Sequence, residues 1–290
     1  MKKIIILVPV FNDWESLIKL LNNINDSILN FKNYEFSCIV INDASTSKQP
    51  KISKPSNLKS LSIINMKDNR GHARCNAFGI RHINAKKIFD YVILMDGDGE
   101  DRPVEIKYLV NEISNNPDTS VVAKRVKRSE GPIFQSMYYA HKLITYIFTG
   151  KKINFGNYSC LTNKDIKILS DKASLWNSYS GSIKKYLQKF NEIESTRGKR
   201  YFGPSKMSLF NLLIHSFSII SVFKYQVFLR SSFAIIILSF LNNTIGTCSI
   251  FLQIMLVVFN LLIFIVSLRE NKQSLLKGDQ NVLDKNEITH

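Results

Sequence analysis

The sequence is poor in the residues that zinc and disulfide sites require. It has four cysteines among 290 residues, no two of them form a CxxC pair, and no histidine cluster lies near any of them. This spacing argues against a zinc site, and it offers no disulfide framework, which favours a reducing compartment. The cysteines are Cys38, Cys75, Cys160 and Cys248.

Acidic residues are also scarce. The chain has 23 Asp and Glu against 39 Lys and Arg, a formal net charge of +16. Such a surplus suits nucleic acid, an anionic membrane surface or a phosphate-bearing substrate. The sequence has no nucleic-acid-binding motif and no basic patch interleaved with aromatic residues, so we expect no nucleic-acid partner.

The start of the chain lacks the cleavage site of a secretory signal. "MKKIIILVPVFNDWE" has two lysines and an apolar run, but the run contains Pro9 and leads into Asn12, Asp13 and Glu15 without small residues. An unbroken aliphatic run is typical of a strand that is covered on both faces. We therefore expect residues 3–10 to form a first β-strand.

Up to about residue 205, short apolar runs alternate with stretches of helical spacing. Alternation of this kind predicts an α/β fold with a doubly wound, mostly parallel sheet. The expected strands are 3–10, 36–43, 61–66, 90–96 and 119–124, and the expected helices are 14–24, 71–83 and 103–114.

The character of the sequence changes after residue 206. Residues 207–225 are apolar with interspersed polar residues, which predicts an amphipathic helix in the membrane interface. Residues 226–268 hold two strongly apolar segments, and the second, 250–268, has 19 residues without a charge, close to the ~20 that span a bilayer. We expect a transmembrane hairpin there and a polar, mobile tail over 269–290.

Basic residues lie at the outer ends of this hairpin. By the positive-inside rule, both ends of the hairpin and the α/β domain of residues 1–206 face the cytoplasm, so we expect a multi-pass protein of the cytoplasmic membrane. The hairpin anchors the domain, and assembly of a homo-oligomer is a second role to consider. The basic residues are Lys224, Arg230, Arg269, Lys272 and Lys277.

The stretch "DGDGED" at residues 96–101 follows the expected strand 90–96. Asp96 and Asp98 can face one hard cation, because Gly97 and Gly99 permit a tight turn. Mg²⁺ or Mn²⁺ held by few carboxylates completes its shell with substrate phosphates. An EF-hand is excluded, since Gly is missing at the sixth position and Glu at the twelfth. On this stretch alone, a solvated acidic turn is an equally good interpretation.

Three further motifs end a strand or open the next helix, and together with the acidic stretch they resemble the family 2 glycosyltransferases of the GT-A fold. Their pattern of PVYNE, a DDGS-like stretch, N-x-G-x-x-x-A and D-x-D occurs here in order. The matching segments are "VPVFND" (8–13), "VINDAST" (40–46), "NRGHARCNAFG" (69–79) and "MDGDGED" (95–101).

The resemblance extends to the polyprenyl-phosphate glycosyltransferase branch, similar to dolichyl-phosphate mannosyltransferase. "DGDGEDRPVEI" looks like D-x-D-x-Q-D-x-P-E, "KRVKR" (124–128) falls where that branch has phosphate-binding arginines, and "RYFGPSKM" (200–207) looks like R-x-x-G-x-S-K-Y. The sequence departs from the pattern at four positions: Asp13 replaces Glu, Asn42 replaces Asp, Ala44 replaces Gly, and Glu100 replaces Gln.

The resemblance implies a metal-dependent, inverting transfer of a sugar from a UDP- or GDP-sugar to a polyprenyl phosphate at the cytoplasmic face of the membrane. Because phosphate oxygen is already anionic near neutral pH, such an acceptor needs no strong general base. The implied catalytic residues are Asp96, Asp98, Arg125 and Arg200, and the implied Mg²⁺ or Mn²⁺ ligands are Asp98, Asp96 and Glu100. The implied donor and phosphate contacts are Pro9, Phe11, Asn12, Asp13, Asp43, Arg70, Gly71, Arg128, Ser205 and Lys206.

Several alternatives stay open at this point. Asp13 and Asp43 suit helix or turn capping, "KRVKR" suits a solvated charge run, and Glu100 suits a base as well as a ligand. The basic stretch 196–206 could attract anionic lipid headgroups instead of a substrate. The acceptor could be a saccharide, or the chain could bind sugar nucleotides without turning them over.

Overall fold

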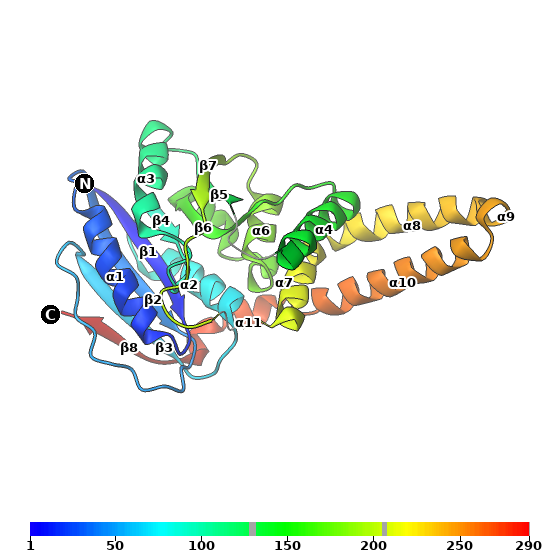
Figure 1. The fold of residues 1–290 in the computed structure, drawn as a ribbon. Helices are drawn as coiled ribbons and strands as arrows, with labels where there is room; N and C mark the ends of the chain where they lie inside the picture. The colour runs from blue at the N-terminus through cyan, green and yellow to red at the C-terminus, as the bar shows by residue number, and fades with distance from the viewer. Residues whose placement is uncertain (128–131, 205–207, 290) are drawn as a thin grey trace.

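The computed structural model describes residues 1–127, 132–204 and 208–289, and its central feature is one mixed sheet (Figure 1). The strands are β1 (Lys2–Val10), β2 (Tyr34–Asn42), β3 (Ser60–Met66), β4 (Tyr91–Leu94), β5 (Val121–Lys127), β6 (Phe155–Thr162), β7 (Asn191–Thr196) and β8 (Val282–Ile288). The α-helices are α1 (Trp14–Ile28), α2 (His72–Lys86), α3 (Ile106–Asn115), α4 (Pro132–Thr149), α5 (Asn163–Leu169), α6 (Tyr179–Tyr186), α7 (Leu209–Ser221), α8 (Lys224–Phe240), α9 (Asn242–Ile245), α10 (Thr247–Ser267) and α11 (Lys272–Leu276). Short 3₁₀ helices are η1 (Pro103–Glu105), η2 (Ala173–Trp176) and η3 (Gly278–Asn281).

Within the described residues the sheet has eight strands, in the order β7-β5-β6-β4-β1-β2-β3-β8. Its centre, β4-β1-β2-β3, is parallel, whereas β6 runs antiparallel to both β4 and β5, and β8 runs antiparallel to β3. The expected parallel core is therefore confirmed, and antiparallel strands extend it on both sides. The carboxyl ends of the four central strands meet at one edge, where open α/β sheets bind ligands.

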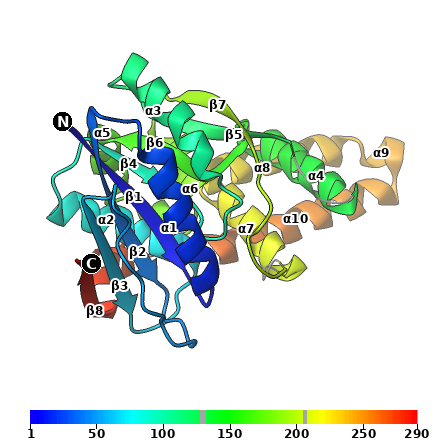
Figure 2. The ribbon, with the colours of Figure 1, turned by 60° about the vertical axis from the view of Figure 1, so that its left-hand side comes forward.

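Helices cover both faces of the sheet, as Figure 2 shows for α1 and α3 on one side and α2 on the other. Alternate residues of β1 divide between two cores: Ile4 and Ile6 pack with α1, and Ile5 and Leu7 pack with α2. Helix α2 approaches β1 so closely at Gly79 that a Cβ there would lie 2.5 Å from Leu7 Cδ1. This two-sided burial explains the continuous aliphatic runs of the central strands.

The apolar segments form a pair of adjacent helices, α8 and α10, that project from the α/β domain (Figure 1). The helical stretch Thr247–Leu276 is long and apolar enough to cross a membrane, and only 11% of its most apolar window is buried. The segments Phe210–Ser221 and Lys224–Phe240 pass the same test only together, with a bend of 88° between them. In the part of the chain that the structure describes, one candidate span thus stands by itself, and the two-span hairpin stays a prediction.

The C-terminal tail is ordered, so its expected mobility is wrong. After α10 the chain returns to the α/β domain, where α11 packs near α2 and β8 pairs with β3. Leu61 pairs with Ile288 at one end of this register and Met66 pairs with Val282 at the other. The tail's polar sequence misled because an edge strand needs few buried side chains and is held mainly by backbone hydrogen bonds.

The elements that were not expected from the sequence include β6, β7, β8, α4, α5, α6 and α11. The α4 helix has four large apolar or aromatic side chains that are about half exposed or more, at helical spacing: Tyr139, Leu143, Tyr146 and Ile147. This face lies on the part of the molecule from which α8 and α10 project, and Arg230 of α8 donates a hydrogen bond to Ile147 O at 2.8 Å. Its apolar residues therefore continue the exposed apolar surface of the projecting pair.

We predict that ending the chain after Leu276 opens the β3 edge of the sheet. Loss of the β8 ladder removes several hydrogen bonds of ~1 kcal/mol each, so amide exchange in β3 should accelerate by at least about tenfold. Hydrogen–deuterium exchange by mass spectrometry measures this, with β4 as the internal reference. Unchanged exchange in β3 would contradict the pairing, and Glu287→Ala serves as the control for a change in β8 that keeps the strand.

Candidate functional site

The loops that follow β1 and β2 hold each other at the carboxyl edge of the sheet. Asn12 has a left-handed backbone (φ 51°), and its backbone N–H donates to Ser45 Oγ at 2.9 Å. Its side chain accepts hydrogen bonds from the backbone and hydroxyl of Ser47, both at 2.9 Å. Asn12 therefore joins the two loops, whereas Phe11 beside it is 41% exposed.

The buried carboxylate of Asp43 connects the β2 loop to the start of α2. Its two oxygens accept hydrogen bonds from the backbone N–H groups of Arg70 and Gly71, each at 2.8 Å. Gly71 is the N-cap residue of α2 and has φ 90°, a conformation that favours glycine. The capping interpretation of Asp43 is therefore correct in part, since Asp43 holds the amides at the start of a neighbouring helix.

The acidic turn follows β4 and packs tightly against two other segments. A Cβ at Gly97 would lie 2.9 Å from Pro9 O, and one at Gly99, where φ is 89°, would lie 2.5 Å from the ring of Tyr201. The backbone N–H of Tyr201 also donates to Asp98 O at 3.0 Å. Glycine is thus required at both positions, and the turn has Pro9 on one side and Tyr201 on the other.

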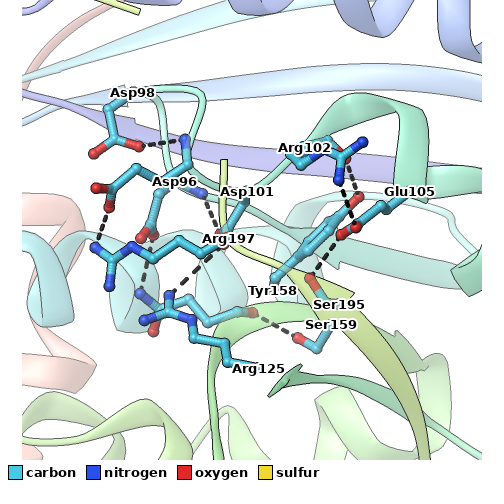
Figure 3. Close-up of polar contacts among 12 residues, drawn as sticks. Asp96, Asp98, Asp101, Arg102, Glu105, Arg125, Tyr158, Ser159, Ser195 and Arg197 are labelled. Atoms are coloured by element: carbon cyan, nitrogen blue, oxygen red, sulfur yellow. Dashed lines mark hydrogen bonds and ion pairs between the residues drawn. The ribbon is translucent and has the colours of Figure 1, made fainter. Parts of the chain in front are cut away.

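Asp96 is held by residues from two further elements. His72 Nε2, at the start of α2, lies 3.1 Å from Asp96 Oδ1, and the Asn157 amide of β6 donates to the same oxygen at 3.0 Å. The backbone N–H of Asp96 donates to Asp101 Oδ2 at 3.0 Å, which closes the turn on itself (Figure 3).

Arg200 connects the acidic turn to the first loop. Its guanidinium donates to Asp98 Oδ2 at 2.6 Å and to Asp13 Oδ2 at 2.5 Å, and all three side chains are less than one-fifth exposed. Asp13 occupies the N-cap position of α1 but makes no capping hydrogen bond with its side chain. The capping interpretation of Asp13 is therefore wrong, and its partner is an arginine that comes from far along the chain.

The last two acidic residues of the turn have arginine partners of their own. Glu100 pairs with Arg197, and Asp101 Oδ1 lies 3.7 Å from Arg125 Nη2. Each carboxylate of residues 96–101 therefore has a basic partner, His72 for Asp96 and an arginine for each of the others, and each partner comes from a different position in the sequence. Figure 3 shows Arg125 and Arg197 directed toward the turn.

Crowding of carboxylates shifts their ionisation. Burial, with the charges of Asp96 and Glu100, raises the pKa of Asp98 to about 6, and burial with the charge of Asp96 raises the pKa of Asp101 to about 7. Burial also acts to raise the pKa of Asp96, but His72 and Arg125 outweigh it and lower that pKa below its usual value. The turn thus concentrates more negative charge than it can hold without cations.

Asp96 and Asp98 have the donor chemistry that a hard divalent cation prefers, at the place where a phosphate could complete the shell. Among the described residues, however, no three Asp, Glu, His or Cys side chains are grouped to hold a metal ion. Glu100 is directed to Arg197, apart from the other two. The residues therefore fit a cation with two protein carboxylates and ligands from a substrate, and the expected set of three does not converge.

Of the other expected site residues, two lie among the described residues and three lie outside them. Arg70 forms an ion pair with Asp68 at 3.6 Å, and Arg125 lies against Gly156, where a Cβ would be 2.8 Å from Nη2. Arg128, Ser205 and Lys206 lie outside the described residues, so their expected phosphate contacts stay predictions.

Three site residues were not expected from the sequence. His72 and Asn157 hold Asp96, and Arg197 pairs with Glu100. His72 directly follows the glycine of "NRGH", which is a usable signal for a residue at the edge of the sheet. Asn157 offers no such signal, because only the antiparallel pairing of β6 with β4 brings it there.

With this geometry established, comparisons with known proteins identify the family. Residues 5–175, more than half of the chain, match the model of glycosyl transferase family 2. The chain belongs to glycosyl transferase family 2. It is therefore a glycosyltransferase with a GT-A-like mixed sheet.

Two curated relatives of this glycosyltransferase carry the name undecaprenyl-phosphate 4-deoxy-4-formamido-L-arabinose transferase. The protein from Proteus mirabilis is 23% identical over 90% of this chain and 77% of its own length. The protein from Photorhabdus laumondii is 25% identical over 73% of this chain and 65% of its own length. Among solved structures, glucosyl-3-phosphoglycerate synthase from Mycobacterium tuberculosis, in complex with Mn²⁺, UDP-glucose and phosphoglyceric acid, shares the fold. Its TM-score is 0.52 at 12% identity, and the match covers 78% of this chain and 80% of that one.

We predict that Ala44 is strained, since it has φ 55° where the family pattern has glycine. Ala44→Val should lower the free energy of unfolding by ~2 kcal/mol, because a β-branched residue in the left-handed region is a steric outlier. Ala44→Gly should be nearly neutral, because relief of strain offsets the greater freedom of the unfolded chain. Denaturant unfolding of the purified protein measures both, and equal stability of the two variants would contradict the strain.

Proposed function

We propose that this glycosyltransferase moves a sugar from a nucleotide-sugar donor to a polyprenyl phosphate at the cytoplasmic face of a membrane, with a divalent cation at the acidic turn. One observation carries the proposal. Arg200, the first residue of the segment that leads to the apolar helices, lies directly on Asp98 and Asp13. Donor-binding and membrane-proximal parts of the chain therefore meet at one point.

The donor diphosphate is assigned to the acidic turn. Asp98 and Asp96 would hold Mg²⁺ or Mn²⁺, and the cation, when bound, would neutralise the charge of the departing nucleoside diphosphate. Burial and the charges of Asp96 and Glu100 raise the pKa of Asp98, and a bound cation would favour its ionised form. The nucleoside is assigned to the loops of Asn12, Asp43 and Gly71, which form the adjoining part of the sheet edge.

The acceptor phosphate is assigned to Arg200, with Lys206 and Ser205 as further contacts. A guanidinium binds carboxylate and phosphate with the same fork of N–H donors, so Arg200 can exchange its carboxylate partners for a phosphate. Arg125, whose side chain is largely buried between Asp101 and Gly156, is placed to stabilise charge at the base of the site.

The reaction is a single displacement. An anionic oxygen of the lipid phosphate attacks the anomeric carbon, the bond from that carbon to the donor diphosphate breaks, and the nucleoside diphosphate leaves with the electron pair. No proton has to be removed from the nucleophile, so the site needs no dedicated general base. Catalysis then depends on positioning of the acceptor phosphate by Arg200 and on electrostatic stabilisation of the leaving group by Arg125.

The membrane assignment rests on the projecting helices. We infer that α8 and α10 span the bilayer as a hairpin, that α7 lies in the interface with α4 beside it, and that the α/β domain faces the cytoplasm. The 88° bend between the segments of α7 and α8 suits a change from an interfacial to a spanning direction. The exposed face of α4 has the helical spacing of an interfacial helix.

The names of the curated relatives support undecaprenyl phosphate as the acceptor to test first. Purified protein in detergent, with Mn²⁺ or Mg²⁺, should release a nucleoside diphosphate from one member of a nucleotide-sugar panel only when undecaprenyl phosphate is present. Asp98→Asn should reduce that rate by at least about 100-fold, because it removes a carboxylate ligand of the cation that would neutralise the leaving group. Asp118→Asn, at an exposed loop position, is the matched control.

Each other outcome points to a specific alternative. Release that depends on a saccharide and not on the lipid would identify a hydroxyl acceptor. Sugar-nucleotide binding without turnover, unchanged in Asp98→Asn, would indicate a non-catalytic binding protein.

We predict that Leu143 of α4 contacts lipid in the reconstituted protein. In a Cys248→Ser background, a fluorophore on Leu143→Cys should be quenched by spin-labelled lipid and shielded from iodide, because the residue faces the interface. The native side chain of Ile88 is 83% exposed on the α/β domain. The same fluorophore on Ile88→Cys should therefore be quenched by iodide and not by spin-labelled lipid. Equal access of iodide to both positions would exclude α4 from the membrane.

A further inference from the structure

A row of polar side chains crosses the sheet near its carboxyl edge. Asn42 of β2 pairs with Asn65 of β3, and Asn65 pairs with Asp284 of β8, so the three residues are cross-strand neighbours. Neighbours of this kind place their side chains on the same face of a sheet, within reach of each other. The row therefore connects the C-terminal strand to the loop that follows β2.

The hydrogen bonds along this row have one direction. Asn65 Nδ2 donates to Asp284 Oδ1 at 2.7 Å, and Asn42 Nδ2 donates to Asn65 Oδ1 at 2.8 Å. The backbone N–H of Ser45 then donates to Asn42 Oδ1 at 3.0 Å. A carboxylate can only accept, so Asp284 sets the orientation of the Asn65 amide, and Asn65 sets that of Asn42.

The far end of the row reaches the loop assigned to the nucleoside. Ser45 is the residue whose hydroxyl accepts from Asn12, and Asp43, next to Asn42, holds the amides of Arg70 and Gly71. The C-terminal segment that contains Asp284 also contacts the loop between β3 and α2, which holds Arg70 and Gly71. Asn281 O accepts from the backbone N–H of Lys67 at 2.7 Å, and its side-chain amide donates to Asp68 O at 3.1 Å.

We propose that Asp284 is a positioning residue for the nucleotide donor, acting through Asn65 and Asn42 on the 43–46 loop. This inference rests on the proposed function, because it presumes that a nucleotide lies at that loop. It also explains why Asn stands at position 42, where the family pattern has Asp. An Asp there would present an oxygen to Asn65 Oδ1, and Asn65 could turn its amide only by presenting Oδ1 to Asp284.

The three residues of the row differ in burial, so substitutions at each of them should affect nucleotide binding to different degrees. Asn42 is 7% exposed, Asn65 is half-buried, and Asp284 is exposed and also accepts from Asn286 at 3.0 Å. At the exposed end, water can partly replace a lost acceptor. At the buried end, water cannot relieve the repulsion between two oxygens that face each other. A change at Asn42 should therefore have a larger effect than a change at Asp284.

The test inverts the polarity of the row and measures Kd for UDP and for GDP, each with Mn²⁺, on the full-length protein in detergent. Asp284→Ala should raise Kd for the nucleotide that binds by about threefold, and Asn42→Asp by about tenfold or more. The double variant Asn42→Asp with Asp284→Asn should return Kd to within about threefold of the wild type, because the amide introduced at position 284 supplies the donor that a turned Asn65 needs. Glu287→Ala, on the same strand with its charge paired to Lys285, is the control that should leave Kd unchanged.

The outcomes separate the two proposals. A wild-type protein that binds neither nucleotide would overturn the proposed function, and the inference would fall with it. A wild type that binds, together with a double variant no better than Asn42→Asp or an unchanged Kd in Asp284→Ala, would overturn the positioning role alone. A general loss of folding cannot imitate the result, because it would not be rescued by a second substitution in an exposed residue.

Discussion

Compensation of negative charge at the turn after β4 is the interaction on which the site depends. Four carboxylates lie within residues 96–101, in surroundings where burial disfavours their ionised forms. Their partners are His72, Arg125, Arg197 and Arg200, which come from separate parts of the chain. The turn thereby brings α2, β5 and the segment after β7 to one place. The same ion pairs therefore hold the fold of the domain together and make up the site.

The sequence was a good guide wherever a pattern was local. The central strands and the helices α1, α2 and α3 follow from uninterrupted aliphatic runs and helical spacing, and Asp96 and Asp98 lie at a strand end as expected. The tight turn expected at the glycines is confirmed by the φ of 89° at Gly99, whereas their close contacts with Pro9 and Tyr201 were not expected. In each case the physical cause acts over a few residues, so it is visible in a short stretch of sequence.

Partners that depend on pairing between distant strands could not be predicted. Asn157 reaches Asp96 only because β6 enters the sheet antiparallel beside β4, and Arg200 reaches Asp13 across most of the domain. Asp13 shows the difficulty well. Its position before a helix is typical of a capping residue, yet an available guanidinium competes successfully for its carboxylate. The tail failed for a related reason, because β8 is held by its neighbour and not by its own apolar pattern.

The position of β8 in the chain also has a consequence for biosynthesis. The strand that completes the sheet is translated after α8 and α10, so the β3 edge has no partner while the apolar helices leave the ribosome. An unpaired strand edge invites association with other chains until it is covered. Under the proposed membrane assignment, completion of the domain therefore follows the delivery of the helices to the bilayer, and a chain that stalls before β8 is released keeps an open strand edge.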